Sequence, residues 1–356
     1  MQAFYVFAAG DERIDATDVV DAAWFRGDLQ PFWREFLAGI ACERLADEEG
    51  SEPDSEALQT LSEDFRYAHD LITAEETDAW LISRNLTLND LTDYANRRYW
   101  RERAIAPSQV PEIVYLNAEP DLRTLFIHDL LFGGRFDELV RLLSWRVAGS
   151  VATVMPDHAL SGRLEEERTR FFQRTALAPG RLSEWLQRLG RDGPWFETLL
   201  EQESRYGWNC DQVRTAENRA RTLAALRLSL TCFDVEMMDL ESADAAREAC
   251  LCLTVDGLSM EALAGQEHYW IEKRELLLEA FPQELQQRFL SAESGEVLQF
   301  ITSADRFQVC RILNKREPAM ADESVLARLD AELIATHFGN LVSKHIVWLL
   351  NRGAHA

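Results

Sequence analysis

The chain has 356 residues, 47% of them hydrophobic, and its 61 acidic and 37 basic residues give a formal net charge of −24. That length is enough for two domains or one large elongated domain, with a hydrophobic core that needs no disulfide bond to be stable. The charge would repel nucleic-acid phosphates and anionic lipid surfaces, so neither is expected as a partner. A partner with basic residues would be attracted, although an acidic surface also serves solubility alone.

The N-terminal sequence and the cysteines favour the cytoplasm. No basic residue precedes the short apolar run that ends at Asp11, so the first residues do not have the form of a secretory signal peptide. No apolar run approaches the roughly 18–20 residues that cross a bilayer. Most of the six cysteines lie in apolar surroundings, where buried, reduced thiols are more common than a disulfide framework.

Helical spacing of apolar residues dominates the first half of the chain. Residues 14–47 follow this spacing, and Pro31 suits the first turn of a second helix within them. Eight acidic residues then fall within Asp47–Asp64, a pattern typical of a solvated, mobile loop. Capping boxes predict the next helix starts, one at Thr73–Glu76 and a looser one, with aspartate in place of glutamate, at Thr87–Asp90.

A spacing of aromatic residues is repeated along the chain. Trp80 follows Phe65 by fifteen residues, and Trp185 follows Phe171 by fourteen. A leucine, a short break and a second amphipathic helix come after each tryptophan. Two copies are too few for a solenoid, so the pattern indicates duplication of one helical module.

The pattern changes towards strands in the last third. We predict one long helix over 211–229, a strand over 231–238 and a helix over 243–253. The alternation of apolar and polar residues then predicts a hairpin with strands at 297–301 and 307–313.

No cofactor or metal site is predicted. His337 and His345 are eight residues apart on one helix, too far for a shared metal without a third element. Cys250 and Cys252 diverge by about 200° on a helix, so they suit neither a metal clamp nor a redox pair. The sequence also lacks the signatures of a phosphate loop, a serine nucleophile elbow and a zinc protease.

Residues 241–318 show a distinctive order of parts. A helix is followed by the segment Asp256–Ala264, by an amphipathic helix at Pro282–Phe289, by Gly295-Glu296 and by the hairpin. This order resembles that of the parvulin-type prolyl isomerases. Together with the preceding helices, this order resembles the SurA and PpiC group of chaperone-isomerases. It looks closest to the PpiC-related proteins associated with peptide maturation systems.

The resemblance implies a mainly α fold in four parts. Two SurA-like helical modules would occupy residues 1–150 and 151–228, and a degenerate parvulin-like α/β domain residues 229–318. Residues 319–356 would form a closing C-terminal helix that packs on the helical part.

The resemblance also bears on function. Active parvulins usually carry one histidine on the first strand and another on the last, whereas here Gln308 stands at the last-strand position and no histidine lies between Leu226 and Asp239. We therefore expect a cytosolic peptide-binding chaperone or escort protein without efficient catalysis, serving a peptide maturation pathway. Any single aromatic is more often core than contact, so the predicted peptide-binding residues are a set: Trp80, Trp185, Tyr269, Trp270, Phe281 and Gln308.

Two other functions remain open at this point. The chain could be an active peptidyl-prolyl cis-trans isomerase, or a helical scaffold for a peptide-modifying enzyme that does not hold the peptide itself. The expected partner is a peptide or an unfolded protein with basic residues, and the modifying enzyme is a further candidate.

Overall fold

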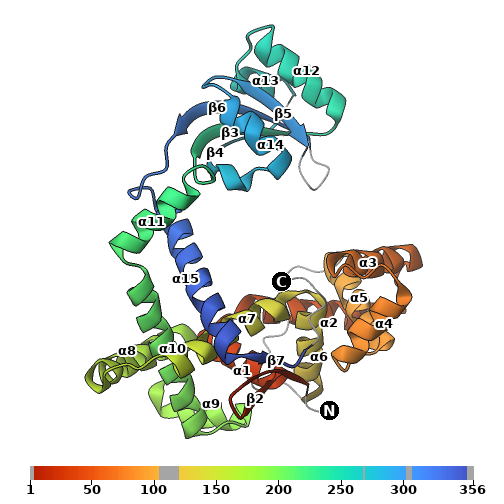
Figure 1. The fold of residues 1–356 in the computed structure, drawn as a ribbon. Helices are drawn as coiled ribbons and strands as arrows, with labels where there is room; N and C mark the ends of the chain where they lie inside the picture. Colours follow the sequence, from red (N-terminus) through yellow and green to blue (C-terminus); the bar gives the residue numbers. More distant parts are fainter. Residues whose placement is uncertain (1–3, 104–119, 268, 302–306, 351–356) are drawn as a thin grey trace. The chain divides into compact units, whose positions relative to one another are not determined.

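The structure is a computed structural model that describes residues 4–103, 120–267, 269–301 and 307–350. The chain divides into two compact units. Unit 1 comprises residues 1–210 and 338–356, and unit 2 comprises residues 211–337. The prediction of a mainly α chain with a small α/β part is confirmed (Figure 1).

Unit 1 is helical around a small three-stranded sheet. The sheet has the order β2-β1-β7 and is antiparallel, with Phe7 of β1 opposite Trp348 of β7. Its elements are β1 (Tyr5–Ala9), β2 (Glu12–Asp15), α1 (Ala16–Arg26), α2 (Gln30–Glu49), α3 (Ser55–Ala68), α4 (Ala74–Ser83), α5 (Leu88–Arg103), α6 (Pro120–Phe132), α7 (Arg135–Ala152), α8 (Asp157–Thr175), η3 (Pro179–Arg181), α9 (Leu182–Leu189), α10 (Gly193–Val213) as far as Cys210, and β7 (Val347–Trp348).

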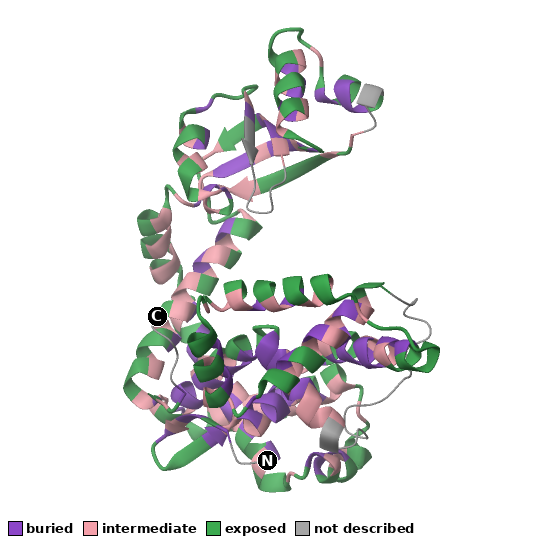
Figure 2. Cartoon of the chain, turned by 90° about the vertical axis from the view of Figure 1, so that its right-hand side faces the viewer, coloured by how far each residue is buried: buried purple, intermediate pink, exposed green. Residues whose placement is uncertain are grey.

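One large apolar core joins the helices of unit 1 to its sheet. Phe7, Phe25, Phe126 and Phe171 are among its fully buried members. Figure 2 shows the buried residues inside this unit and the exposed ones along the outer sides of its helices. The last part of α15 (Glu323–His345) packs on the same core through Leu341 and Val342. Phe338 of this helix stacks on Trp145, at 5.7 Å between ring centroids, and on Tyr206, at 4.8 Å.

Unit 2 contains a four-stranded antiparallel sheet in the order β4-β3-β6-β5. The predicted strands near 231–238, 297–301 and 307–313 are confirmed. The elements are α11 (Ala216–Leu226), β3 (Cys232–Leu240), α12 (Ala243–Thr254), α13 (Met260–Glu267), β4 (Ile271–Leu277), η4 (Leu278–Ala280), α14 (Gln283–Ser291), β5 (Val297–Ile301), β6 (Phe307–Arg316) and α15 as far as His337.

The two faces of this sheet carry separate cores. Phe233 and Val235 of β3 pack with α14 and η4, whereas Met238 and Leu240 pack with α12 and α13. The strand alternation that sends neighbouring side chains to opposite faces produces this division. Strands β3 and β6 are therefore covered by helices on both faces.

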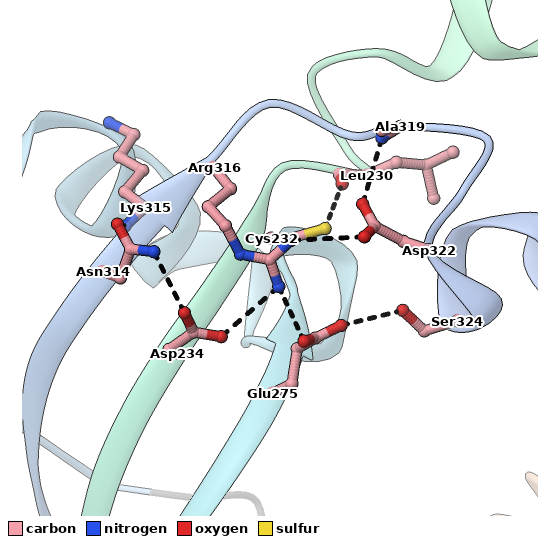
Figure 3. A network of polar contacts seen from close by, with 10 residues as sticks. All are labelled: Leu230, Cys232, Asp234, Glu275, Asn314, Lys315, Arg316, Ala319, Asp322 and Ser324. Atoms are coloured by element: carbon pink, nitrogen blue, oxygen red, sulfur yellow. Dashed lines mark hydrogen bonds and ion pairs between the residues drawn. The ribbon is translucent and has the colours of Figure 1, made fainter.

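Arg316 ties the end of β6 to the elements around it (Figure 3). Its guanidinium lies 2.6 Å from Glu275 of β4, 3.4 Å from Asp234 of β3 and 3.3 Å from Asp322, just before α15. One cation thus links two strands and the start of the last helix.

Two predictions for the helices are wrong. Most of the acidic block Asp47–Asp64 is helical rather than loop, because α2 continues to Glu49 and α3 begins at Ser55. The Asp54 side chain caps α3, and Leu61 and Phe65 are buried on its inner face. The single helix expected over 211–229 is instead interrupted after Val213, where Thr215 caps a new helix.

Candidate functional site

The paired strands β3 and β6 of unit 2 bring an amide beside a carboxylate. Gln308 of β6 is paired with Asp239 of β3, and its amide nitrogen donates a hydrogen bond to the Asp239 carboxylate. Gln308 is half-buried and Asp239 is exposed. Neither side chain carries an imidazole, and together the amide and the carboxylate offer hydrogen-bond donors and acceptors at the surface of the sheet.

The aromatic residues predicted in unit 2 do not gather at one place. Phe281 is 4% exposed, and its ring is stacked 3.8 Å from that of Phe289 in the core beneath α14. Tyr269 is half-buried against the α12 and α13 core, on the other face of the sheet. Trp270 is 82% exposed. Of these three, only Trp270 presents most of its surface to solvent.

The aromatic spacing repeated in the sequence is also a repeated geometry in unit 1. Phe65 and Trp80 meet edge to face at 5.1 Å, and Phe171 and Trp185 meet edge to face at 5.2 Å. The chain turns in the same way after each tryptophan. The amide of Leu86 donates to Leu81, and that of Arg191 donates to Leu186, both at 2.9 Å.

The two tryptophans differ in what lies beside them. Trp80 is half-buried and packs against His69 and Phe132, with the Arg84 guanidinium 4.1 Å above its ring. Trp185 is 8% exposed and lines a pocket of about 240 Å³. Of the two tryptophans, Trp185 of the second repeat therefore lies beside a pocket.

The pocket beside Trp185 forms where four helices begin or end. The end of α1 contributes Trp24 and Gly27, and the start of α2 contributes Gln30. The end of α8 and the turn after it contribute further residues, and α9 contributes Trp185. Gly27 ends α1 with a φ of 80°, a left-handed conformation that favours glycine, and the chain then turns into α2 beside the pocket. The rest of the lining is Arg174, Thr175, Leu177, Arg181, Glu184 and Arg188.

The wall of this pocket is apolar and its rim is charged. Trp24, Leu177 and Trp185 supply apolar surface. Arg181 and Arg188 both pair with Glu184, with 3.0 Å between the Nε of Arg181 and the carboxylate. These contacts hold the pKa of Glu184 below its usual value, chiefly through the hydrogen bond from Arg181, so Glu184 is ionised at neutral pH.

A second pocket of about 290 Å³ lies between α2, α5, α6 and α7. It mixes acidic and basic side chains over the rings of Phe32, Phe36 and Phe126. Asp129 in its wall is held by Arg97 at 2.5 Å, and burial raises the pKa of this carboxyl. None of the residues predicted for peptide binding lines this pocket.

Of the residues predicted from the sequence for peptide binding, Trp185 lines this pocket, and the residues around it were not predicted. Trp24, Leu177 and the three arginines come from separate elements, and no motif joins them. A weak signal existed, because Arg181, Glu184 and Arg188 follow the three- and four-residue spacing at which helical side chains pair.

Within the described ranges, no three histidine, cysteine or acidic side chains are grouped so that they could hold a metal ion. Among the helices in those ranges, none is long and apolar enough to cross a bilayer.

No family model matches the chain, and neither does any curated protein. Several solved structures do match it. The peptidylprolyl isomerase PrsA of Bacillus anthracis is 11% identical, covers 59% of this chain and 95% of its own, and has a TM-score of 0.35. PrsA of Bacillus cereus is 13% identical, covers 64% of this chain and 89% of its own, and has a TM-score of 0.37. A structure from a study of PEB4 and Cj1289, described as SurA-like chaperones of Campylobacter jejuni, is 9% identical. It covers 62% of this chain and 87% of its own, and its TM-score is 0.20.

Proposed function

We propose that this chain is a peptide-binding chaperone or escort protein in which unit 2 is a parvulin-like module without efficient isomerase activity. The observation that carries the proposal is the pocket beside Trp185, which combines an apolar wall with charged side chains at its rim. Such a site suits one side chain of an extended or unfolded segment, because apolar area supplies affinity and the polar rim fixes orientation.

The proposal for unit 2 rests on its order of elements and on Gln308. Rotation about a peptide bond has a barrier of roughly 18–20 kcal/mol, which an isomerase lowers with an apolar pocket and hydrogen-bond donors. Here the Gln308 amide already donates to Asp239. We therefore propose that hydrogen bonding to a peptide remains and that catalysis is poor.

The proposed setting is a peptide maturation pathway in the cytoplasm, where buried thiols such as Cys232 and Cys310 stay reduced. The partner would be a precursor peptide or an unfolded protein. A preference for basic partners remains a prediction from the net charge of −24.

Peptide binding can be measured by fluorescence anisotropy with a labelled, unfolded peptide. We expect the Leu177→Asp variant, which places a charge in the apolar wall, to lose most of the binding. The matched control is Val154→Asp, because Val154 is 96% exposed in the same unit and does not line the pocket. The double variant Tyr269→Ala with Trp270→Ala tests the contribution of unit 2. If a folded intact chain bound no peptide but captured a peptide-modifying enzyme, the scaffold function would replace this proposal.

Catalysis can be measured with a proline-containing peptide in a cis-trans isomerisation assay. We expect a rate close to the uncatalysed one, which Gln308→Ala leaves unchanged. A rate near that of an active parvulin, lost in Gln308→Ala, would establish the isomerase function instead.

A further inference from the structure

The pocket beside Trp185 is too small for most cofactors and large enough for one side chain. Its volume of about 240 Å³ lies below the roughly 300–1,000 Å³ typical of small-molecule sites. Trp24, Leu177 and Trp185 form its apolar wall. An aromatic or long aliphatic side chain therefore fits it better than a nucleotide or a flavin.

The charge around the pocket is positive, unlike that of the chain. Arg181 and Arg188 share the single carboxylate of Glu184. Arg174, also in the lining, shares Glu167 with Arg170 at 2.9 and 3.3 Å. Arg170 also pairs with Glu166 at 3.4 Å, so these four guanidinium groups stand against three carboxylates, an excess of one positive charge. Of the charged residues that line the pocket itself, three are arginines and one is a glutamate.

The helix ends do not change this balance. The pocket lies at the starts of α2 and α9, where backbone N–H groups favour negative charge, and at the ends of α1 and α8, where carbonyl groups favour positive charge. Two ends of each polarity offset one another. The arginines therefore set the local charge.

We infer that this pocket holds an apolar side chain flanked by carboxylates, and hence that it selects acidic, hydrophobic peptide segments. The inference rests on the proposed peptide-binding function and narrows its substrate class. It reverses the expectation from the net charge of −24, because near about 0.15 M salt charges beyond about 8 Å are largely screened. At that distance, the arginines at the rim outweigh the acidic surface elsewhere.

The test uses the full chain and matched, fluorescein-labelled peptides at one salt concentration. Each peptide has a central tryptophan flanked by aspartates, by asparagines or by lysines, and a fourth has a central alanine flanked by aspartates. We expect the aspartate-flanked tryptophan peptide to bind most tightly. The lysine-flanked and alanine-centred peptides are expected to bind most weakly.

A pair of charge-matched variants tests whether the arginines cause this preference. Arg181→Gln with Arg188→Gln removes two positive charges at the pocket, and Arg221→Gln with Arg247→Gln removes two from exposed helix positions in unit 2. Exposed ion pairs contribute about 0.2–1 kcal/mol each, so the loss of two should make the pocket variant bind the aspartate-flanked peptide roughly two- to thirtyfold more weakly. The control should bind it as the unmodified chain does.

The outcomes separate this inference from the proposed function. Equal binding of the three tryptophan peptides, a preference for lysine flanks, or equal effects of the two variants would overturn the acidic selectivity and leave peptide binding intact. Failure of the folded chain to bind any of these peptides would overturn both.

Discussion

At the scale of single residues, the most unusual group in unit 1 is a buried carboxylate. Asp21 of α1 is 0% exposed and pairs with Arg123 at 3.0 Å and Arg191 at 2.8 Å. Burial raises its pKa from 3.8 to about 6, although Arg191 and Arg123 favour the ionised form. Desolvation therefore outweighs two ion pairs at this position.

This pKa predicts a definite pH dependence. Because folded Asp21 holds its proton up to about pH 6 and the unfolded chain loses it near 3.8, this group's contribution to stability is greatest below pH 4 and falls as the pH rises to 6. A shift of this size corresponds to about 3 kcal/mol. In Asp21→Asn that contribution is absent, so the unfolding free energy of the unmodified chain minus that of the variant should fall between pH 4 and 7.

Urea unfolding at several pH values measures this difference. Arg191 keeps Asp18 as a partner at 2.8 Å in the variant, so one ion pair of the site survives. A constant difference across this range would show that the ion pairs balance desolvation, and a rising one that they outweigh it; either result would contradict this prediction.

At the scale of elements, the sequence predicts those helix starts that are set by residues close to one another in the chain. The capping box at Thr73–Glu76 forms, and Pro31 lies in the first turn of α2. The acidic block was misread because composition outweighed the apolar spacing of Leu61 and Phe65 in α3. In the sheet of unit 1, β1 pairs locally with β2, but its other neighbour β7 lies more than 300 residues away, a pairing that no local pattern predicts. The arginines at the pocket come from separate elements, so no local pattern predicts their grouping either.

Two glycines in neighbouring helices should respond to alanine in opposite ways. A Cβ at Gly149 of α7 would lie 2.9 Å from the ring of Phe338, which is 0% exposed and stacked on both sides. A Cβ at Gly162 of α8 would meet nothing within 4 Å. Overpacking costs about 1–3 kcal/mol, and alanine gains about 0.5–1 kcal/mol over glycine in a helix.

We therefore expect Gly149→Ala to destabilise the protein by about 1 kcal/mol and Gly162→Ala to stabilise it by about 0.5–1 kcal/mol. Thermal and urea unfolding of both variants measure the two signs. A stabilised Gly149→Ala variant would mean that Phe338 can move aside.

At the scale of the whole molecule, unit 1 is completed by the end of the chain. Residues 338–356 contribute Phe338 and β7, although residues 211–337 form unit 2. Removing residues 338–356 should cost unit 1 at least the roughly 3–5 kcal/mol of a buried phenylalanine and expose the edge of β1. Limited proteolysis should then cut unit 1 much faster, with unit 2 keeping its protection. Equal protection of unit 1 with and without these residues would contradict this prediction.

The pairing of Phe7 with Trp348 also sets an order of events during synthesis. A ribosome that adds about 5–20 residues per second makes β7 roughly 17–70 s after β1. Unit 2 is also made late, because its last residue, His337, precedes β7 by only ten residues. The core of unit 1 must therefore wait for its last strand through almost the whole of synthesis. The helices of unit 1 that are made first thus spend that interval with the edge of β1 unpaired and their shared core incomplete.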